Sequence, residues 1–396
     1  MANPNEQVAE QSPKASKVII AVNTSHGIGY FVDSEGTFLF KKQFEMVSKF
    51  SEGLAPVKQN GKWGVINTQG EVVVPCIYYY TGGFSEGLAP VKQNDKWGFI
   101  NTNGELVIPC IYDDALDFSE GLALVAQNDK WGYINTQGEV VVPCIYYYTG
   151  GVSEGLAQVW QNGKGGYINT QGEVVVPCIY DCAEDFSKGL APVKQNDRWG
   201  YINTQGEVVV PCIYDFAWYF FEGLAKVQQN GKWGYINTQG EVVVPCIYDD
   251  NAWAFSEGLA GVGQNGKWGF INTKGEVVLP CIYDGAGSFS EGLARVKQNG
   301  KWGVINTQGE VISPCIYDNA ESFSEGLARV HQNGKYCYIN TKGEVVIPCI
   351  YNEACGFYEG LAKVKQNEKY SIINTQGKVI VAECDGFFTF WSKVEL

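Results

Sequence analysis

Short apolar runs separated by Gly, Asn and polar residues recur along the whole chain. In one copy of the pattern, Leu54–Gln59 and Lys62–Asn67 flank the dipeptide Asn60-Gly61. An Asn-Gly pair between two such runs predicts a β-hairpin, because its tight turn needs positive φ at both central residues. A third run, residues 72–75, is rich in β-branched side chains and ends at a proline, which cannot donate to a sheet ladder. Each copy therefore predicts a three-stranded antiparallel meander.

The copies follow one another at a fixed spacing, which a tryptophan marks. Each step is 34 residues, except for a step of 35 between Trp233 and Trp268. The tryptophans are Trp63, Trp97, Trp131, Trp199, Trp233, Trp268 and Trp302, and Gly165, Tyr336 and Tyr370 take the same position in other copies. A fixed period of this size indicates a repeat architecture, whose units bury their apolar faces against each other.

We therefore predict an all-β tandem array of three-stranded antiparallel meanders of about 34 residues, built as an extended or superhelical stack. The alternative is a closed propeller-like ring, which the strand count disfavours because propeller blades usually have four strands. Residues 1–17 are polar and are expected to form a flexible tail. Residues 18–396 are expected to form one repeat domain with a degenerate N-terminal copy, ten recognisable copies and a divergent C-terminal cap.

Particular positions within each copy carry further expectations. The glycine represented by Gly70 recurs in all ten copies and predicts a positive φ. The glycine after the tryptophan is replaced by Cys337 and Ser371 in two copies, so we expect a demand for small size. The element expected to pack close to this backbone is the tryptophan ring or the proline of a neighbouring copy. The tryptophan itself is expected to be buried. Turns that use Asn94-Asp95 in place of Asn-Gly are expected to be weaker or longer.

Composition and charge limit the kinds of partner and the cellular locations that are expected for the protein. The net charge is −14 at pH 7, and no basic stripe is present for a phosphate backbone to follow, so nucleic acid is not expected as a partner. No stretch approaches 18 apolar residues, so no membrane span is expected. The N-terminus lacks the features of a standard secretory signal, which makes the cytoplasm the default location and leaves a non-standard export route open.

Thirteen cysteines are present, and nine of them follow the proline of a copy: Cys76, Cys110, Cys144, Cys178, Cys212, Cys246, Cys281, Cys315 and Cys349. One cysteine per unit among valine and isoleucine predicts free thiols that pack as small apolar groups in a reducing compartment. Paired spacings of the zinc-binding kind are missing, and Cys178 with Cys182 is the nearest approach. We therefore expect no metal.

The repeated segments 61–71 and 52–55 resemble the bacterial WG-repeat family, named for its Trp-Gly pair. The resemblance covers about nine tenths of the chain. It implies an all-β repeat fold and a role in interactions, and it transfers no catalytic residue or cofactor. Cysteine after the proline, Gly165 in the tryptophan position and Tyr336-Cys337 depart from the family pattern.

The residues themselves favour no enzyme. Only His26 and His331 are histidines, and they lie in copies far apart in the sequence. Recurring glutamates such as Glu71, Glu105 and Glu139 are interpreted as solvated strand starts, since a hydrolase needs one asymmetric pair of carboxylates. We expect neither a catalytic site nor a cofactor.

Two positions vary most between copies: the exposed strand position of Lys58 and the segment that returns the chain to the next copy. Aromatic residues at these variable positions are candidate partner-binding anchors: Tyr147, Tyr148, Trp160, Phe216, Trp218, Tyr219 and Trp253. The alternative is that they fill gaps under the loops. The sequence thus predicts a non-catalytic scaffold for protein–protein interaction. A carbohydrate-binding module, with tryptophan and tyrosine faces for glycans, and a purely structural spacer are the alternatives.

Overall fold

The computed structural model of the chain describes residues 16–24, 27–249, 252–384 and 387–395. These ranges contain strands, turns and irregular segments and no helix, which confirms the all-β prediction. Of the predicted tail 1–17, only Ser16 and Lys17 are described, and they begin strand β1 (Ser16–Thr24).

Three strands of each copy match the predicted meander. The first runs through the Leu-Ala segment, the second through the Trp-Gly segment, and the third through the Pro-Cys segment. The first strands are β4 (Leu54–Gln59), β8 (Leu88–Gln93), β12 (Leu122–Gln127), β16 (Leu156–Gln161), β20 (Leu190–Gln195), β24 (Leu224–Gln229), β27 (Leu259–Gln264), β31 (Leu293–Gln298), β35 (Leu327–Gln332) and β39 (Leu361–Gln366). The second strands are β5 (Lys62–Asn67), β9 (Lys96–Asn101), β13 (Lys130–Asn135), β17 (Lys164–Asn169), β21 (Arg198–Asn203), β25 (Lys232–Asn237), β28 (Lys267–Asn272), β32 (Lys301–Asn306), β36 (Lys335–Asn340) and β40 (Lys369–Asn374). The third strands are β6 (Val72–Tyr78), β10 (Leu106–Tyr112), β14 (Val140–Tyr146), β18 (Val174–Tyr180), β22 (Val208–Tyr214), β26 (Val242–Tyr248), β29 (Val277–Tyr283), β33 (Val311–Tyr317), β37 (Val345–Tyr351) and β41 (Val379–Cys384).

The return segments add a further strand that the sequence analysis did not predict. It pairs antiparallel with the first strand of the following meander, so most sheets have four strands. These strands are β3 (Met46–Val47), β7 (Tyr80–Thr81), β11 (Asp114–Ser119), β15 (Tyr148–Ser153), β19 (Cys182–Ala183), β23 (Phe216–Phe221), β30 (Gly285–Ala286), β34 (Asn319–Ala320) and β38 (Glu353–Ala354). The sheet β27-β28-β29 has three described strands.

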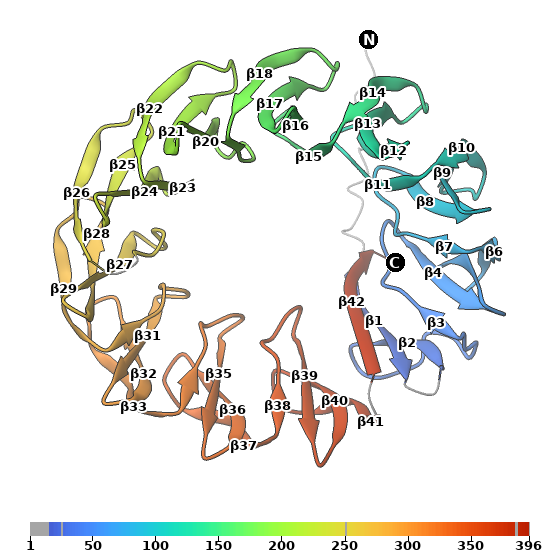
Figure 1. The fold of residues 1–396 in the computed structure, drawn as a ribbon. Helices are drawn as coiled ribbons and strands as arrows, with labels where there is room; N and C mark the ends of the chain where they lie inside the picture. Colours follow the sequence, from blue (N-terminus) through green and yellow to red (C-terminus); the bar gives the residue numbers. More distant parts are fainter. Residues whose placement is uncertain (1–15, 25–26, 250–251, 385–386, 396) are drawn as a thin grey trace, which may run out of the picture.

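The sheets follow one another along a curved array, and the two ends of the described chain meet (Figure 1). The last strand, β42 (Phe387–Glu395), pairs antiparallel with β1, which also pairs with β2 (Gly29–Asp33). Segments from the two ends of the sequence therefore share one sheet. The predicted tandem array of antiparallel units of about 34 residues is confirmed.

The turns have the conformations that their residues favour. Asn60 and Gly61 have φ values of 51° and 72°, as the predicted hairpin requires. Asn94 and Asp95 also have positive φ, and Gln93 pairs with Lys96 as Gln59 pairs with Lys62, so this turn is no longer than the Asn-Gly turn. Gly70 has a φ of 80°, which confirms the prediction for that position.

The glycine after the tryptophan is required by a close backbone approach within its own copy. A Cβ on Gly64 would lie 2.4 Å from the Val74 carbonyl oxygen. The third strand continues past Pro75 to Tyr78, and its register with the second strand shifts at this point, which brings the bulged backbone against the glycine. The predicted demand for small size is confirmed, but the close element is the same copy's Pro-Cys segment rather than a neighbouring copy.

The apolar core lies between successive sheets. Tyr201, Val210 and Tyr214 of one sheet pack against Ala225 and Ile236 of the next. Tyr201 and Ile236 are fully buried, whereas Trp199 is half-buried. The prediction of a buried tryptophan is therefore wrong. The tryptophan is the second residue of its strand, beside the hairpin turn, and the most deeply buried positions are two and three residues further along.

Candidate functional site

Aromatic rings from several copies lie along one edge of the array. Each tryptophan faces a variable residue across the hairpin, as Trp63 faces Lys58. In two places a ring from the return segment, that of Tyr80 or Phe216, lies between the tryptophans of two sheets. The Tyr80 ring centroid is 6.3 Å from that of Trp63 and 5.2 Å from that of Trp97. These half-buried tryptophans and the rings beside them form the aromatic edge of the array.

The edge is interrupted at Gly165, which stands where the other copies have an aromatic ring. Trp160, directly opposite in the register, carries the ring instead. A Cβ on Gly165 would lie 3.2 Å from Trp160 ring atoms and 2.9 Å from Ala183 Cβ. Trp160 thus occupies part of the space of the missing tryptophan, and its Nε1 has no hydrogen-bond partner among the described residues.

A hollow of about 610 Å³ lies beside Trp160 and Gly165. It lies between the sheet that begins with β15 and the sheet that begins with β19. Its lining residues are Tyr147, Tyr148, Gln158, Trp160, Gly163, Cys182, Ala183 and Glu184. Tyr147 and Tyr148 are 68% and 58% exposed, the Lys130 ammonium lies over the Tyr147 ring, and Trp160 is half-buried. The structure thus brings three of the predicted anchors to one place.

The polar side of the hollow carries carboxylates. Glu184 accepts hydrogen bonds from the Tyr219 hydroxyl at 3.0 Å and from the Cys182 thiol at 3.4 Å. Gln158 Nε2 donates to Asp185 at 2.7 Å. Burial, and then the Glu184 charge, raise the pKa of Cys182 to about 11, so its thiol stays protonated at neutral pH. This arrangement suits the recognition of a ligand better than nucleophilic chemistry.

The other predicted anchors lie elsewhere on the same edge. Trp218 is 42% exposed and stacks on Phe216. Phe216 is half-buried between Trp199 and Trp233, with ring centroids 6.0 and 5.6 Å away.

Two predicted anchors are engaged in internal packing. Tyr219 is half-buried and bonded to Glu184. Trp253 is half-buried, stacks on Trp268 at 5.6 Å and occupies the space beside Gly261. Their rings therefore contribute to contacts between copies.

Sequence reasoning missed several residues of the site. Gln158, Cys182, Ala183 and Glu184 were not predicted, because no motif marks them and only the fold brings them together. Tyr79 and Tyr80, which are 58% and 46% exposed, were also left out of the candidate set. A signal for these two was present, since residues 79–83 and 147–151 have the same sequence, Tyr-Tyr-Thr-Gly-Gly.

The repeated unit matches a known family. The model of the WG containing repeat matches ten successive segments: residues 31–63, 63–97, 97–131, 131–164, 166–199, 199–233, 233–268, 268–302, 302–336 and 338–370. The chain belongs to the WG-repeat family. None of the curated proteins compared with it matches the sequence.

Several solved structures align with this WG-repeat protein over much of its length, at low sequence identity and low TM-score. A crystal structure of the eukaryotic initiation factor is 14% identical, with a TM-score of 0.41 over 95% of this chain and 98% of that one. Hsv2 of Kluyveromyces lactis is 8% identical, with a TM-score of 0.34 over 69% of this chain and 94% of that one. PorZ, a surface component of the type-IX secretion system of Porphyromonas gingivalis, is 10% identical, with a TM-score of 0.25 over 86% of this chain and 52% of that one. These scores are too low for the likeness to bear on function.

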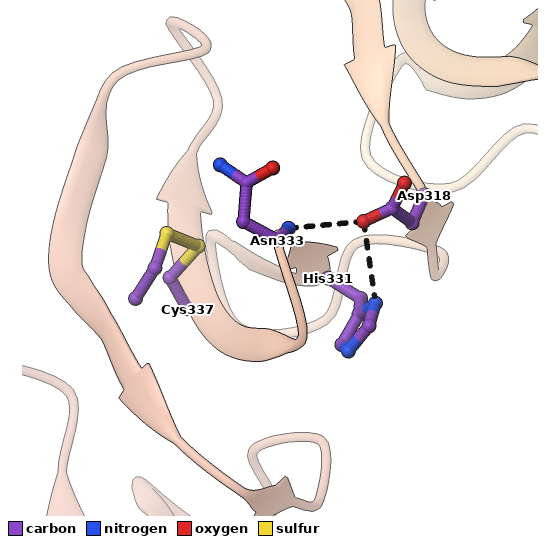
Figure 2. The surroundings of a disulfide bond; sticks show 5 residues. Asp318, His331, Asn333 and Cys337 are labelled. Carbon is purple, nitrogen blue, oxygen red and sulfur yellow. Dashed lines mark hydrogen bonds and ion pairs between the residues drawn. A yellow bond between two sulfur atoms is a disulfide. The ribbon is translucent and has the colours of Figure 1, made fainter.

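One Pro-Cys thiol of the WG-repeat protein is paired. Cys337, in the glycine position, forms a disulfide with Cys349 of the same copy (Figure 2). The prediction of nine free thiols is therefore wrong for Cys349, because the Pro-Cys backbone approaches the glycine position closely and a cysteine there meets the facing sulfur. The other eight Pro-Cys residues are free and half-buried, and burial raises the pKa of each thiol, as for Cys212.

One of the two histidines, His331, lies among the described residues and faces an aspartate. His331 Nδ1 lies 3.7 Å from Asp318, which also accepts a hydrogen bond from the Asn333 backbone N–H at 3.0 Å (Figure 2). His26 lies outside the described residues. Over the described ranges, no group of three or more His, Cys, Asp or Glu residues could hold a metal ion. In the same ranges, no helix has the length and apolar character needed to cross a bilayer.

Proposed function

We propose that this WG-repeat protein is a non-catalytic scaffold that binds a protein partner along its aromatic edge. The observation that carries the proposal is the exposure of Tyr147 and Tyr148 beside Trp160 at one hollow. A folded protein leaves few large aromatic side chains this accessible, and tyrosine and tryptophan are the residues that most often dominate binding energy at protein interfaces.

The position of these residues within the repeat supports the same proposal. The side chains that hold copies together, such as Val142 and Ile168, are buried, whereas Tyr147 and Tyr148 belong to the variable return segment. Comparable tyrosines, Tyr79 and Tyr80, lie two copies earlier on the same kind of segment. Spaced contacts of this kind would let several weak interactions act together on one extended partner.

The test compares the full chain with a variant in which Tyr147 and Tyr148 are both replaced by serine. Immobilised proteins are exposed to a lysate of the source organism, and the retained proteins are quantified by mass spectrometry. We expect one partner to bind the original chain and to lose affinity for the variant by more than about 1 kcal/mol. Val311→Ser, which changes an exposed apolar residue in another copy, is the matched control and should retain the partner.

Thermal unfolding must first show that both variants keep the fold. A glycan microarray with the same proteins tests the alternative class. Binding of a glycan that depends on Tyr147 and Tyr148, without a protein partner, would replace the scaffold by a carbohydrate-binding module. If neither a protein nor a glycan distinguishes the variant from the original chain, the aromatic edge has no recognition role and the spacer interpretation stands.

Tyr219 is a poor target for such a test. A double change of Trp218 and Tyr219 to serine would also remove the hydrogen bond that the Tyr219 hydroxyl donates to Glu184 in the preceding sheet. Loss of that hydrogen bond would disturb packing between copies as well as binding. Trp218→Ser alone is the cleaner variant, because the Trp218 side chain is 42% exposed.

A further inference from the structure

The hollow beside Trp160 corresponds to a place that a cationic side chain fills in other copies. Gln158, Gly165 and Ala183 are equivalent to Arg295, Trp302 and Ala320, which lie 137 residues further along. There the Arg295 guanidinium lies 5.0 Å from the Trp302 ring centroid, and its Nη1 donates to the Ala320 carbonyl oxygen at 2.5 Å.

A second copy has the same arrangement with a lysine. Lys226 Nζ lies 5.1 Å from the Trp233 ring centroid and donates to the Ala252 carbonyl oxygen at 3.1 Å. In both copies, a cation covers an aromatic face and reaches the carbonyl of the next return segment. The fold therefore builds a site for a positive charge at this position.

The copy with the hollow has the walls of such a site and lacks the internal cation. Gln158 is neutral and its amide is bonded to Asp185. The aromatic surface comes from Trp160 and Tyr148, and the Ala183 backbone is the counterpart of Ala252 and Ala320.

Glu184 supplies an acidic group at the same place. The equivalent residue four copies later, Glu321, is ion-paired with Arg329. The residue equivalent to Arg329 in the sheet of Glu184 is Pro192, which carries no charge. Glu184 makes no ion pair among the described residues, although it accepts the two hydrogen bonds from Tyr219 and Cys182.

The lysines around the hollow already have partners. Lys130 lies over the Tyr147 ring, Lys164 pairs with Asp181, and Lys194 pairs with Asp197 at 3.1 Å. The whole chain carries a net charge of −14, which favours a cationic partner.

We infer that the hollow receives the guanidinium group of an arginine side chain presented by the protein partner. This inference rests on the proposed scaffold function and names the group that the scaffold recognises. A planar guanidinium stacks on aromatic faces and can pair with a carboxylate through two parallel hydrogen bonds, which suits a space walled by Trp160 and Tyr148 and edged by Glu184. Lysine supplies the charge without the planar surface and is expected to bind more weakly.

The experiment titrates the full chain with N-acetyl-L-argininamide and follows the indole N–H signal of Trp160 by NMR, assigned by its loss in Trp160→Phe. N-acetyl-L-citrullinamide is the neutral control, since it has nearly the same shape without the charge. We expect saturable shifts with the arginine compound and about tenfold weaker binding of the citrulline compound. Added salt should weaken binding of the arginine compound only.

Two variants locate the site. Glu184→Gln should lower the affinity for the arginine compound about fivefold or more, because it removes the carboxylate. The double variant Trp160→Lys with Gly165→Trp recreates the pair found at Lys58 and Trp63, and should fill the hollow and abolish binding. Thermal unfolding checks that the double variant folds, and Glu184→Gln provides a separate test if it does not.

Several outcomes would overturn the inference. They are equal binding of the citrulline compound, unchanged affinity in Glu184→Gln, and retained binding in a folded double variant. Binding of free L-arginine about tenfold tighter than the capped compound would instead indicate a small-molecule site. If Tyr147 and Tyr148 are needed to capture a partner but the arginine compound does not bind, this inference fails and the scaffold stands. If the arginine compound binds but no protein partner is captured, the guanidinium site stands and the proposed scaffold function fails.

Discussion

At the scale of single residues, space rather than special backbone geometry explains the glycine of the Trp-Gly pair. The φ of Gly200 is not positive, yet a Cβ on this residue would lie 2.4 Å from the Val210 carbonyl oxygen. The contacting atom belongs to backbone and cannot rotate away. Ser371 is tolerated at the equivalent place because its third strand has one residue fewer between the paired positions Val381 and Cys384.

Gly200→Ala should therefore destabilise its copy. We expect a loss of about 1–3 kcal/mol or more in the free energy of unfolding, because the third strand must shift to admit the methyl group. Gly356→Ala is the matched control, since nothing lies within 4 Å of its added Cβ and its φ is not positive. Denaturant unfolding of both variants checks the difference. Equal stability of the two variants would contradict the close-approach account.

The sequence predicted the backbone conformations that depend only on neighbouring residues in the chain. The Asn-Gly turn and the positive φ of Gly70 follow from the chain near each residue, and both are observed. The disulfide at Cys337 depends on the bulge within the third strand, which shifts the register and cannot be predicted from the pattern of apolar residues.

At the scale of strands and sheets, polar side chains hold successive copies together. Ser85 Oγ donates to the Phe118 carbonyl of the next copy at 2.8 Å, and Glu86 accepts from the Gly121 N–H at 2.9 Å. The recurring Phe-Ser-Glu-Gly segment thus carries links between sheets as well as surface charge. The sequence could not reveal this, because each bond joins residues more than 30 positions apart.

A second link joins a lysine, an aspartate and the following turn. Asp181 pairs with Lys164 and accepts from the Asn196 backbone N–H at 2.8 Å. The hydrogen bond from Lys164, and then that from Asn196, lower the pKa of Asp181 below its ordinary value of 3.8. The Asp181 carboxylate therefore binds a proton more readily in the unfolded chain than in the folded chain. The stabilising contribution is complete above the ordinary value and is lost as the pH falls through the lower folded-state pKa.

Asp181→Asn should remove this pH-dependent contribution. At pH 7 we expect faster hydrogen exchange at the Asn196 amide in the variant than in the original chain, because the charged acceptor is lost. As the pH falls through the lowered folded-state pKa of Asp181, the two proteins should converge, after correction for the intrinsic exchange rate. Asp129→Asn, a change in another hairpin turn, should leave the Asn196 amide unaffected. A difference that persists undiminished in acid would argue against the ion-paired link.

The sequence predicted only some of the residues that line the candidate site. Trp160 stands out because no other copy has a tryptophan at its position, and Tyr147 and Tyr148 stand out because only Tyr79 and Tyr80 match them among the other copies. Glu184 and Ala183 belong to the following sheet, and their approach to Trp160 depends on how two sheets pack. Gly165 alone gave a clue, since a missing ring leaves space that another residue or a ligand must fill.

At the scale of the whole molecule, the repeat pattern predicted the array, but the meeting of its ends had no sequence signal. The strand β42 lies beyond the last repeat match and pairs along its length with β1. In this sheet β1 is the central strand, between β2 and β42. Pairing between the two ends must bring together segments separated by most of the chain, and no local pattern specifies such a partner.

Removal of β42 should leave β1 as an exposed edge. We expect a chain that lacks residues 387–396 to show faster hydrogen exchange at the β1 amides that face β42, because those donors lose their partners. Strands β20 and β21, several sheets away, should keep their protection, since each sheet contacts only its neighbours. Replacement of residues 387–395 by alternating serine and glycine keeps the length and should give the same result. Unchanged protection of β1 in both variants would show that the pairing of the two ends contributes nothing to holding the array together.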